Sequence, residues 1–312
     1  MSAVSVAGRT VRLGTRRSAL ALTQARLVAA QLDGSGVDID LVEVSTLGDR
    51  SAAAVAQLGG TGVFVTALRE QLYGGAVDVV VHSLKDLPTE PAPGLWLAAI
   101  PLREDPRDVL VDRAGRTLAE LAPGTRVGTG SPRRTAQLRA LGLGLDVVPI
   151  RGNVDTRLGM VAAGQLDAVV LARAGLARLG RLAEVSEVLD PLQLLPAPGQ
   201  GALAVECRGD DDAVVELLRP LDDADSRAAV TAERSLLAGL SAGCTAPVGA
   251  LADVAEGDAE PEIYLRAAVV TLDGRRALRL SATGPAPAAA EVGHRLAADL
   301  LDAGAADLME NR

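Results

Sequence analysis

Residues 82–86, His-Ser-Leu-Lys-Asp, bring together four side chains that can donate, accept or hold a proton. They follow residues 77–81, an almost unbroken β-branched run that is typical of a strand buried on both faces. Because ligands of open α/β sheets bind at the carboxyl ends of strands, this position predicts a site. Lys85 is the only lysine among 31 basic residues, which favours a need for a compact ammonium group there. Asp86 is the carboxyl best placed for acid–base work or for stabilising a cation.

Arginines accompany three predicted helix starts, each at the end of a strand. The sequence Gly-Thr-Gly-Ser-Pro-Arg-Arg offers Ser131 as an N-cap, followed by proline at the first helical position. Since arginines in a first turn oppose the helix dipole, Arg133 and Arg134 predict an anion held by backbone N–H groups and guanidinium forks. Arginines recur beside Ser18 and around Asn153. Without a phosphate-binding loop sequence, this dispersed set suits a ligand with several carboxylates better than a nucleotide.

Composition excludes several other classes. A net charge of −9 and 1% aromatic residues argue against nucleic-acid binding. The first residues lack an apolar signal core, and no run of about 18 apolar residues predicts a membrane span, so we expect a cytoplasmic protein that binds no membrane. Two histidines exclude a histidine-rich metal site, and we expect no metal.

The two cysteines form neither a disulfide framework nor a metal-binding motif. Cys207 ends a predicted strand and fits the behaviour of a small buried hydrophobic residue. Cys244 follows Gly243 after a predicted helix, a position accessible to a bulky adduct. On local sequence alone, an inert role is the commoner one for either cysteine.

The elements that position these residues form two similar lobes. The sequence Arg-Leu-Gly-Thr from Arg12 resembles Arg-Val-Gly-Thr from Arg126, and residues 75–83 resemble residues 164–172. The first lobe carries about 25 more residues between these markers, which matches a predicted mobile loop at 51–62. Two such α/β lobes imply a cleft between them. We assign strands and helices to the first lobe as follows: strands at 10–15, 37–45, 77–81 and 95–100, and helices at 18–31 and 63–72.

Three domains follow from this pattern. A strand at 201–207 and a helix to residue 219 return to the first lobe, and residues 101–108 mark the crossover to the second. From residue 222 a long helix, three strands with an Asp-Gly hairpin turn, and a closing helix predict a small α+β domain. The predicted boundaries are 1–101 with 202–219, 102–201, and 222–312.

An ordered set of motifs carries a resemblance over nearly the full length of the chain. They are Arg16-x-Ser18, His82-Ser-Leu-Lys-Asp-Leu-Pro, Arg103-Glu-Asp-Pro-Arg-Asp108, Gly128-Thr-Gly-Ser-x-Arg-Arg134, Arg151-Gly-Asn-Val-x-Thr-Arg157, Leu195-Pro-x-Pro-Gly-Gln-Gly201 and Gly243-Cys244. Together they resemble the porphobilinogen deaminase (hydroxymethylbilane synthase) family. No single motif would be specific, but the ordered set is.

The resemblance implies a fold, a cofactor and a set of site residues. The fold is two lobes like those of periplasmic binding proteins plus a small C-terminal domain. A dipyrromethane cofactor is expected to be joined by a thioether to Cys244, and the catalytic aspartate matches Asp86. The residues expected to hold acetate and propionate groups of cofactor and substrate are Arg16, Ser18, Lys85, Thr129, Ser131, Arg133, Arg134, Arg151, Arg157 and Arg178. Phe64 is a candidate face for a pyrrole ring, with core packing as its alternative.

The implied reaction is a transferase step of porphyrin and haem biosynthesis. Four porphobilinogen molecules condense head to tail, each losing ammonia, to give hydroxymethylbilane. We expect a monomer whose product passes to uroporphyrinogen III synthase. In the loop before Phe64 this chain has Gln57 and Thr61 where the family often carries lysines, so no electrostatic role of that loop carries over.

Two other classes share some of these features. A carboxylate sensor or solute-binding protein would have the lobes and the arginines, but has no use for Cys244 or Asp86. A nucleic-acid binder would explain the arginines alone, against the charge and the lack of aromatic residues.

Overall fold

The computed structural model describes residues 8–44, 62–243 and 246–310, without the side chains of residues 62–64 and 310. The chain forms two compact units. One comprises Met1–Glu104 and Ala202–Arg227, and the other comprises Asp105–Gly201 and Ala228–Arg312. Within the described residues no helix is long and apolar enough to cross a bilayer.

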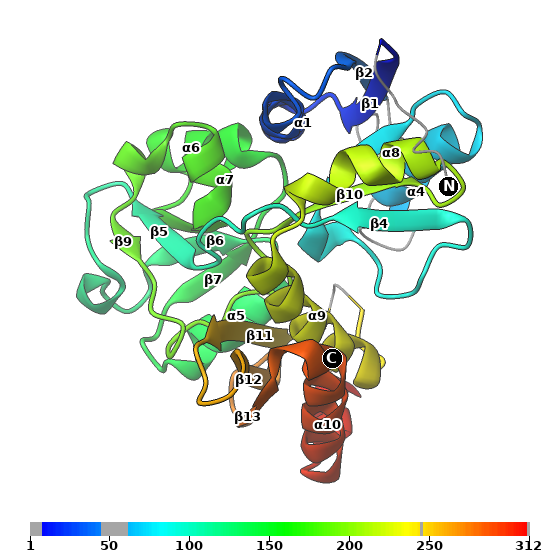
Figure 1. Cartoon of the computed structure of the whole chain (residues 1–312). Helices are drawn as coiled ribbons and strands as arrows, with labels where there is room; N and C mark the ends of the chain where they lie inside the picture. The colour runs from blue at the N-terminus through cyan, green and yellow to red at the C-terminus, as the bar shows by residue number, and fades with distance from the viewer. Residues whose placement is uncertain (1–7, 45–61, 244–245, 311–312) are drawn as a thin grey trace. The chain divides into compact units, whose positions relative to one another are not determined.

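The first lobe is a five-stranded sheet in the order β2-β1-β3-β10-β4. β1, β2 and β3 are parallel, whereas β10 runs antiparallel to both β3 and β4. The elements are β1 (Thr10–Arg16), α1 (Ala19–Gln31), β2 (Asp38–Val44), α4 (Gly62–Tyr73), β3 (Val79–Ser83), β4 (Leu95–Ala99), β10 (Leu203–Arg208) and α8 (Asp212–Leu218) (Figure 1). The strand that precedes Asp86 is therefore central in its sheet.

The core of this lobe explains why β3 is apolar on both faces. Val79 and Val81 pack in a buried cluster with α1 and α8, which contribute Val28 and Val214. Val80 belongs to a second cluster with Leu68 and Leu72 of α4. The predicted burial on both faces is confirmed.

The second lobe repeats this topology with the order β7-β6-β8-β5-β9. β6, β7 and β8 are parallel, and β5 runs antiparallel to β8. The elements are β5 (Asp108–Asp112), β6 (Arg126–Thr129), α5 (Pro132–Ala140), β7 (Asp146–Pro149), α6 (Val154–Ala162), β8 (Ala168–Ala172), α7 (Arg173–Arg178) and β9 (Glu187–Val188). Gly14 pairs with Val80 in the first sheet, and Gly128 pairs with Val169 in the second, so the predicted internal repeat is confirmed.

A C-terminal region completes the second unit. Its antiparallel sheet has the order β11-β12-β13 and shares one core with the helices around it (Figure 1). The elements are α9 (Ala224–Gly239), β11 (Val248–Ala255), β12 (Glu262–Val270), β13 (Ala277–Pro285), α10 (Ala289–Asp302) and α11 (Ala305–Glu310). This region packs against the second lobe through buried residues such as Ala136, Leu195 and Leu251. The division into three domains stays a prediction.

The 3-10 helices are η1 (Leu84–Asp86), η2 (Leu118–Glu120), η3 (Leu182–Glu184), η4 (Arg219–Leu221) and η5 (Ala286–Ala288).

Two sequence-based assignments differ from the structure. The central strand lies at Val79–Ser83 rather than 77–81, because its partner β10 pairs with it as far as Ser83. The predicted crossover at 101–108 ends in a strand, β5, whose pairing partner β8 lies about 60 residues further along the chain.

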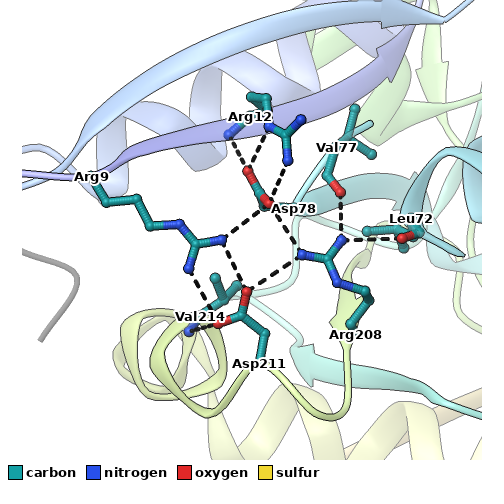
Figure 2. Close-up of polar contacts among 8 residues, drawn as sticks. All are labelled: Arg9, Arg12, Leu72, Val77, Asp78, Arg208, Asp211 and Val214. Carbon is teal, nitrogen blue, oxygen red and sulfur yellow. Dashed lines mark hydrogen bonds and ion pairs between the residues drawn. The ribbon is translucent and has the colours of Figure 1, made fainter. Parts of the chain in front are cut away.

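Partly exposed arginines pair with one buried aspartate at the amino end of β3. Asp78 accepts hydrogen bonds from the backbone N, Nε and Nη2 of Arg12 at 2.9–3.0 Å. It also accepts hydrogen bonds from the guanidinium groups of Arg9 and Arg208, each at 3.2 Å. Asp211 accepts hydrogen bonds from the same two arginines and so bridges them (Figure 2). Burial alone would raise the pKa of Asp78, but the hydrogen bonds from Arg12 and Arg208 hold it well below its usual range. This network lies at the strand end opposite to Asp86.

The second lobe carries a reduced version of the same device. The carboxylate of Asp167 accepts a hydrogen bond from the backbone N of Arg126 at 2.9 Å. The backbone N of Asp167 donates to the Arg126 carbonyl at 3.0 Å, just as Asp78 donates to Arg12 in the first lobe at 2.8 Å. An aspartate before the central strand therefore fixes its register against the first strand in both lobes.

Candidate active site

The first group of candidate residues lies at the carboxyl end of β3. The chain leaves this strand at Ser83 and forms one 3-10 turn, Leu84–Asp86, which closes with a hydrogen bond from the backbone N of Leu87 to the Leu84 carbonyl at 3.0 Å. Leu84 and Leu87 are buried and hold the turn in the core, whereas Lys85 and Asp86 are half-buried. Asp86 is thus held on a short hydrogen-bonded turn at the carboxyl end of the central strand.

The neighbouring strand brings a second pair of residues to the same edge. β1 is parallel to β3 and ends at Arg16, and Ser18 then caps α1 by accepting a hydrogen bond from the backbone N of Ala21 at 3.3 Å. Gln24 of α1 donates to the Ser83 hydroxyl at 3.0 Å, which links the helix to the end of β3. The first lobe therefore places Arg16, Ser18, Lys85 and Asp86 at the carboxyl ends of two neighbouring parallel strands.

The second lobe confirms the predicted helix start at Ser131. The Ser131 hydroxyl accepts from the backbone N of Arg134 at 3.5 Å, and Pro132 occupies the first turn. Thr129, buried at the end of β6, accepts through its hydroxyl from the backbone N of Ser131 at 3.2 Å. A Cβ at Gly130 would stand 2.6 Å from the Ile150 carbonyl oxygen, so only glycine fits this turn.

Arg133 and Arg134 are buried, with exposed fractions of 3% and 5%, and share one carboxylate. Asp108, the first residue of β5, lies 2.9 Å from Arg133 Nη2 and 2.7 Å from Arg134 Nη2. The Gln200 amide adds a donor to Asp108 at 2.7 Å. Burial would raise the pKa of Asp108, but the two guanidinium groups hold it well below its usual range, so the carboxylate is charged. Backbone carbonyls of Leu195 and Val170 accept from the same two arginines.

Asp108 belongs to this site although the sequence patterns do not indicate it. Two arginines in a first helical turn predict an anion opposite them, and part of that anion is the chain's own carboxylate. The available signal was its place at the end of the Arg103–Asp108 motif. The pairing spans 25 and 26 residues, so local sequence patterns do not reveal it.

The arginine cluster keeps a surplus of positive charge. Asp108 balances one of the two buried guanidinium groups, and among the described residues no hydrogen-bond acceptor meets the buried Nε atoms of Arg133 and Arg134. Arg157 adds a third cation, and its pKa is lowered by burial and by the charge of Arg134. A ligand carboxylate would satisfy both the unused donors and the surplus charge. These residues therefore fit a cofactor or substrate that carries several carboxylates.

The outer candidates lie on the loops and helices around this cluster. Asn153 caps α6 by accepting from the backbone N of Thr156 at 2.9 Å, as predicted. Arg157, in the first turn of that helix, donates from Nε to the Gly152 carbonyl at 2.8 Å. Arg178 at the end of α7 donates to the Gly201 carbonyl at 2.6 Å, and Arg151 is exposed.

Some predicted residues lie outside what the structure describes. Cys244 and most of the loop at 51–62 lie outside the described residues, and the side chain of Phe64 does as well. Cys207 is buried, and burial raises the pKa of its thiol to about 12, so it is uncharged at neutral pH. The candidates of the first and second lobes belong to different units. The expected cleft and a ligand that contacts both sets stay predictions.

The matching family models and the similar sequences agree on one family. Residues 11–216 match the family model "porphobilinogen deaminase, dipyromethane cofactor binding domain", and residues 227–302 match "porphobilinogen deaminase, C-terminal domain". The porphobilinogen deaminase of Mycobacterium tuberculosis (strain H37Rv) is 57% identical over 304 residues, which cover 96% of this chain and 98% of that protein. The porphobilinogen deaminase of Nocardia farcinica is 56% identical over 307 residues, 97% of this chain and 88% of that protein.

Among solved structures, a putative methionine-binding lipoprotein from Bacillus subtilis is similar with a TM-score of 0.43 and 12% identity. That match covers 68% of this chain and 90% of the lipoprotein. A periplasmic substrate-binding protein of an ABC transporter from Coxiella burnetii has a TM-score of 0.42 and 16% identity, over 68% of this chain and 91% of that protein.

Proposed function

Because the chain belongs to the porphobilinogen deaminase family, we propose that its first lobe performs the chemistry of that reaction while its second lobe holds carboxylates. The chain is a transferase of porphyrin and haem biosynthesis that condenses four porphobilinogen molecules head to tail, releasing one ammonia for each, into hydroxymethylbilane. Its cofactor is dipyrromethane, and its substrate carries an acetate and a propionate group. The negative charges of these acetate and propionate groups match the basic side chains among the candidate residues of the two lobes.

The observation that carries the proposal is the arginine cluster built around Asp108. Two buried arginines are oriented by one internal carboxylate, yet they retain buried Nε donors and a surplus of positive charge. Two guanidinium groups beside one buried carboxylate leave a net positive charge, which a ligand carboxylate can neutralise. Each charge-assisted hydrogen bond to such a ligand contributes about 1.5–3 kcal/mol.

We assign Asp86 to the chemical step. When ammonia leaves porphobilinogen, positive charge develops on the pyrrole ring, and a fixed carboxylate stabilises that charge more in the transition state than in the ground state. The half-buried position of Asp86 on a turn anchored by Leu84 and Leu87 supports this role. As a carboxylate, Asp86 can also accept hydrogen bonds from the pyrrole N–H groups. In its protonated form it can donate a proton to the departing amine.

The binding residues divide between the cofactor and the substrate. When bound, the dipyrromethane supplies the pyrrole end to which substrate units are joined. We propose that Cys244 holds it through a thioether and that Lys85, Asp86, Ser131, Arg133 and Arg134 orient it. The proposed substrate contacts are Arg16, Ser18, Phe64, Thr129, Arg151, Arg157 and Arg178. By holding carboxylates on both sides of the reacting carbon, these residues set which pyrrole atom attacks.

The remaining assignments concern the setting of the enzyme. We propose that the enzyme is a cytoplasmic monomer whose product passes to uroporphyrinogen III synthase. The linear tetrapyrrole is the substrate that a ring-closing synthase needs.

A product assay tests the proposed function. The purified chain, incubated with porphobilinogen, should release one ammonia per porphobilinogen consumed and one hydroxymethylbilane per four. Asp86→Asn should lower that rate by several orders of magnitude, because one electrostatic group is typically worth about 10²–10³ and loss of proton transfer adds to it. Glu90→Gln, an exposed carboxyl four residues further on, is the matched control and should leave the rate unchanged. Reversible porphobilinogen binding without ammonia release would favour a carboxylate sensor instead.

A further inference from the structure

Three ionisable side chains from three elements of the first lobe meet in its core. Arg69 of α4 donates from Nε and Nη2 to the two oxygens of Glu206 on β10, at 3.1 and 2.8 Å. His82 of β3 places Nε2 3.1 Å from the Glu206 Oε2 atom, a distance at which the two groups attract, although the angle is outside the range of a hydrogen bond. Glu206 and His82 are only 3% and 6% exposed.

Glu206 is ionised in this position. Burial raises its pKa, but the interactions with His82 and Arg69 outweigh burial and lower the pKa of Glu206 to about 2. A charged carboxylate at this depth carries a large desolvation penalty, and buried ion pairs often contribute no net stability relative to apolar residues of similar size. Stability alone therefore does not account for this cluster.

The second lobe provides an internal comparison for Glu206. Glu206 pairs with Val80 across the first sheet, and Val111 pairs with Val169 across the second. Val80 and Val169 are equivalent, since each is the partner of the repeated glycine in the neighbouring parallel strand. The position of Glu206 in the first lobe is thus occupied by valine in the second.

The same comparison holds for His82. It lies two residues after Val80, as Leu171 lies two residues after Val169. Leu171 and Val111 are both buried in one apolar cluster. The fold therefore accepts an apolar pair at these two positions, and only the lobe that carries Asp86 has polar side chains there instead.

We propose that Arg69, Glu206 and His82 form a positioning triad for the turn that carries Asp86. His82 is the penultimate residue of β3 and precedes Asp86 by four positions, so its tether to Glu206 limits movement of the strand end. Arg69 extends the tether to α4, the helix whose first turn includes Phe64. The triad thereby fixes the elements that present the catalytic carboxylate and the candidate pyrrole contact. This assignment rests on the proposed function of Asp86.

The triad predicts an effect on rate that is separate from stability. The double variant Arg69→Met with Glu206→Val keeps His82 but removes its contact with Glu206 and the ion pair between Arg69 and Glu206. Adding His82→Leu recreates the apolar pair of the second lobe. We expect both variants to keep the thermal midpoint of the parent protein or to raise it. The KM for porphobilinogen should stay within about 3-fold, while kcat falls about 10²-fold, because a displacement of about 1 Å at a catalytic group has that effect.

Arg12→Met is the matched control. It breaks an ion pair of the same lobe, to Asp78 at the opposite end of β3, and should lower the thermal midpoint while leaving kcat unchanged. A kcat within 3-fold of the parent in the double variant would overturn the proposal, as would an equal loss of kcat in Arg12→Met. If the triple variant does not fold, the double variant decides on the same criteria. Absence of product from the parent protein would instead refute the proposed function.

Discussion

Asp108→Asn should destabilise the protein strongly. The carboxylate makes ion pairs of 2.9 and 2.7 Å with Arg133 and Arg134 and accepts from Gln200 at 2.7 Å, all within the core of the second lobe. Asparagine keeps one acceptor oxygen, turns a donor towards the remaining cation, and leaves two buried guanidinium groups without their shared charge. Removing one partner of a buried pair typically costs about 3–5 kcal/mol.

Thermal unfolding measures this effect. At about 2–4 °C per kcal/mol for a unit of this size, the thermal midpoint should fall by about 6–20 °C. Asp155→Asn is the matched control, because Asp155 makes an exposed ion pair with Arg181 and such pairs are worth at most about 1 kcal/mol. Equal, small shifts in both variants would refute the claim that Asp108 holds the arginine cluster together.

The stability difference between the parent protein and Asp108→Asn should depend on pH, because folding lowers the pKa of Asp108. A carboxyl whose pKa is lowered by folding stabilises the folded state above its unfolded pKa of about 3.9, and that stabilisation is lost as the pH falls towards the folded pKa. The difference in stability between the parent protein and Asp108→Asn should therefore stay constant from about pH 5 to pH 8. It should become smaller only below about pH 4. A gap that changes between pH 6 and pH 8 would show that another group controls it.

Three further predictions concern the other ionisable and nucleophilic groups. Asp86→Asn should slow each single-turnover addition of substrate to cofactor-loaded protein far more than it weakens binding, and Asp86→Glu should retain part of the rate because the charge survives; near-normal addition with weakened binding would make Asp86 a binding residue. Cys244→Ser should fold normally but carry no cofactor by intact mass, whereas Cys207→Ser should keep the cofactor and lose about 1–3 kcal/mol of stability because it buries a hydroxyl; equal cofactor loss in both would contradict the assignment. Asp78→Asn should lower the thermal midpoint by removing the shared partner of three arginines while leaving the carboxylate site intact, and unchanged stability in chemical unfolding would show that the network is dispensable.

Local sequence signals predicted the features that depend on near neighbours. The caps at Ser18, Ser131 and Asn153 each join a side chain to a backbone N–H three residues on, so residue type and position suffice to predict them. The internal repeat was visible for a similar reason, because each lobe keeps, in the same order, a glycine in its first strand and an aspartate directly before its central apolar strand. These signals placed Arg16, Lys85 and Asp86 at the ends of predicted strands.

Contacts between distant segments could not be predicted from one sequence. Asp108 reaches Arg134 across 26 residues, and Arg69 reaches Glu206 across 137. In both cases a strand that enters an otherwise parallel sheet in the antiparallel direction carries the acid, and nothing in the local pattern tells which strand it will join. The arginines consequently looked unpaired in the sequence, and the acids that orient them became visible only in the folded chain.

Intact mass spectrometry of the purified protein, before and after addition of porphobilinogen, tests whether the chain builds its product on a cofactor held by Cys244. We expect a resting mass equal to the chain plus two linked pyrrole units on Cys244. With substrate, we expect a ladder of species, each heavier by one porphobilinogen less one ammonia. A resting mass equal to that of the bare chain, with reversible porphobilinogen binding and no ladder, would contradict it.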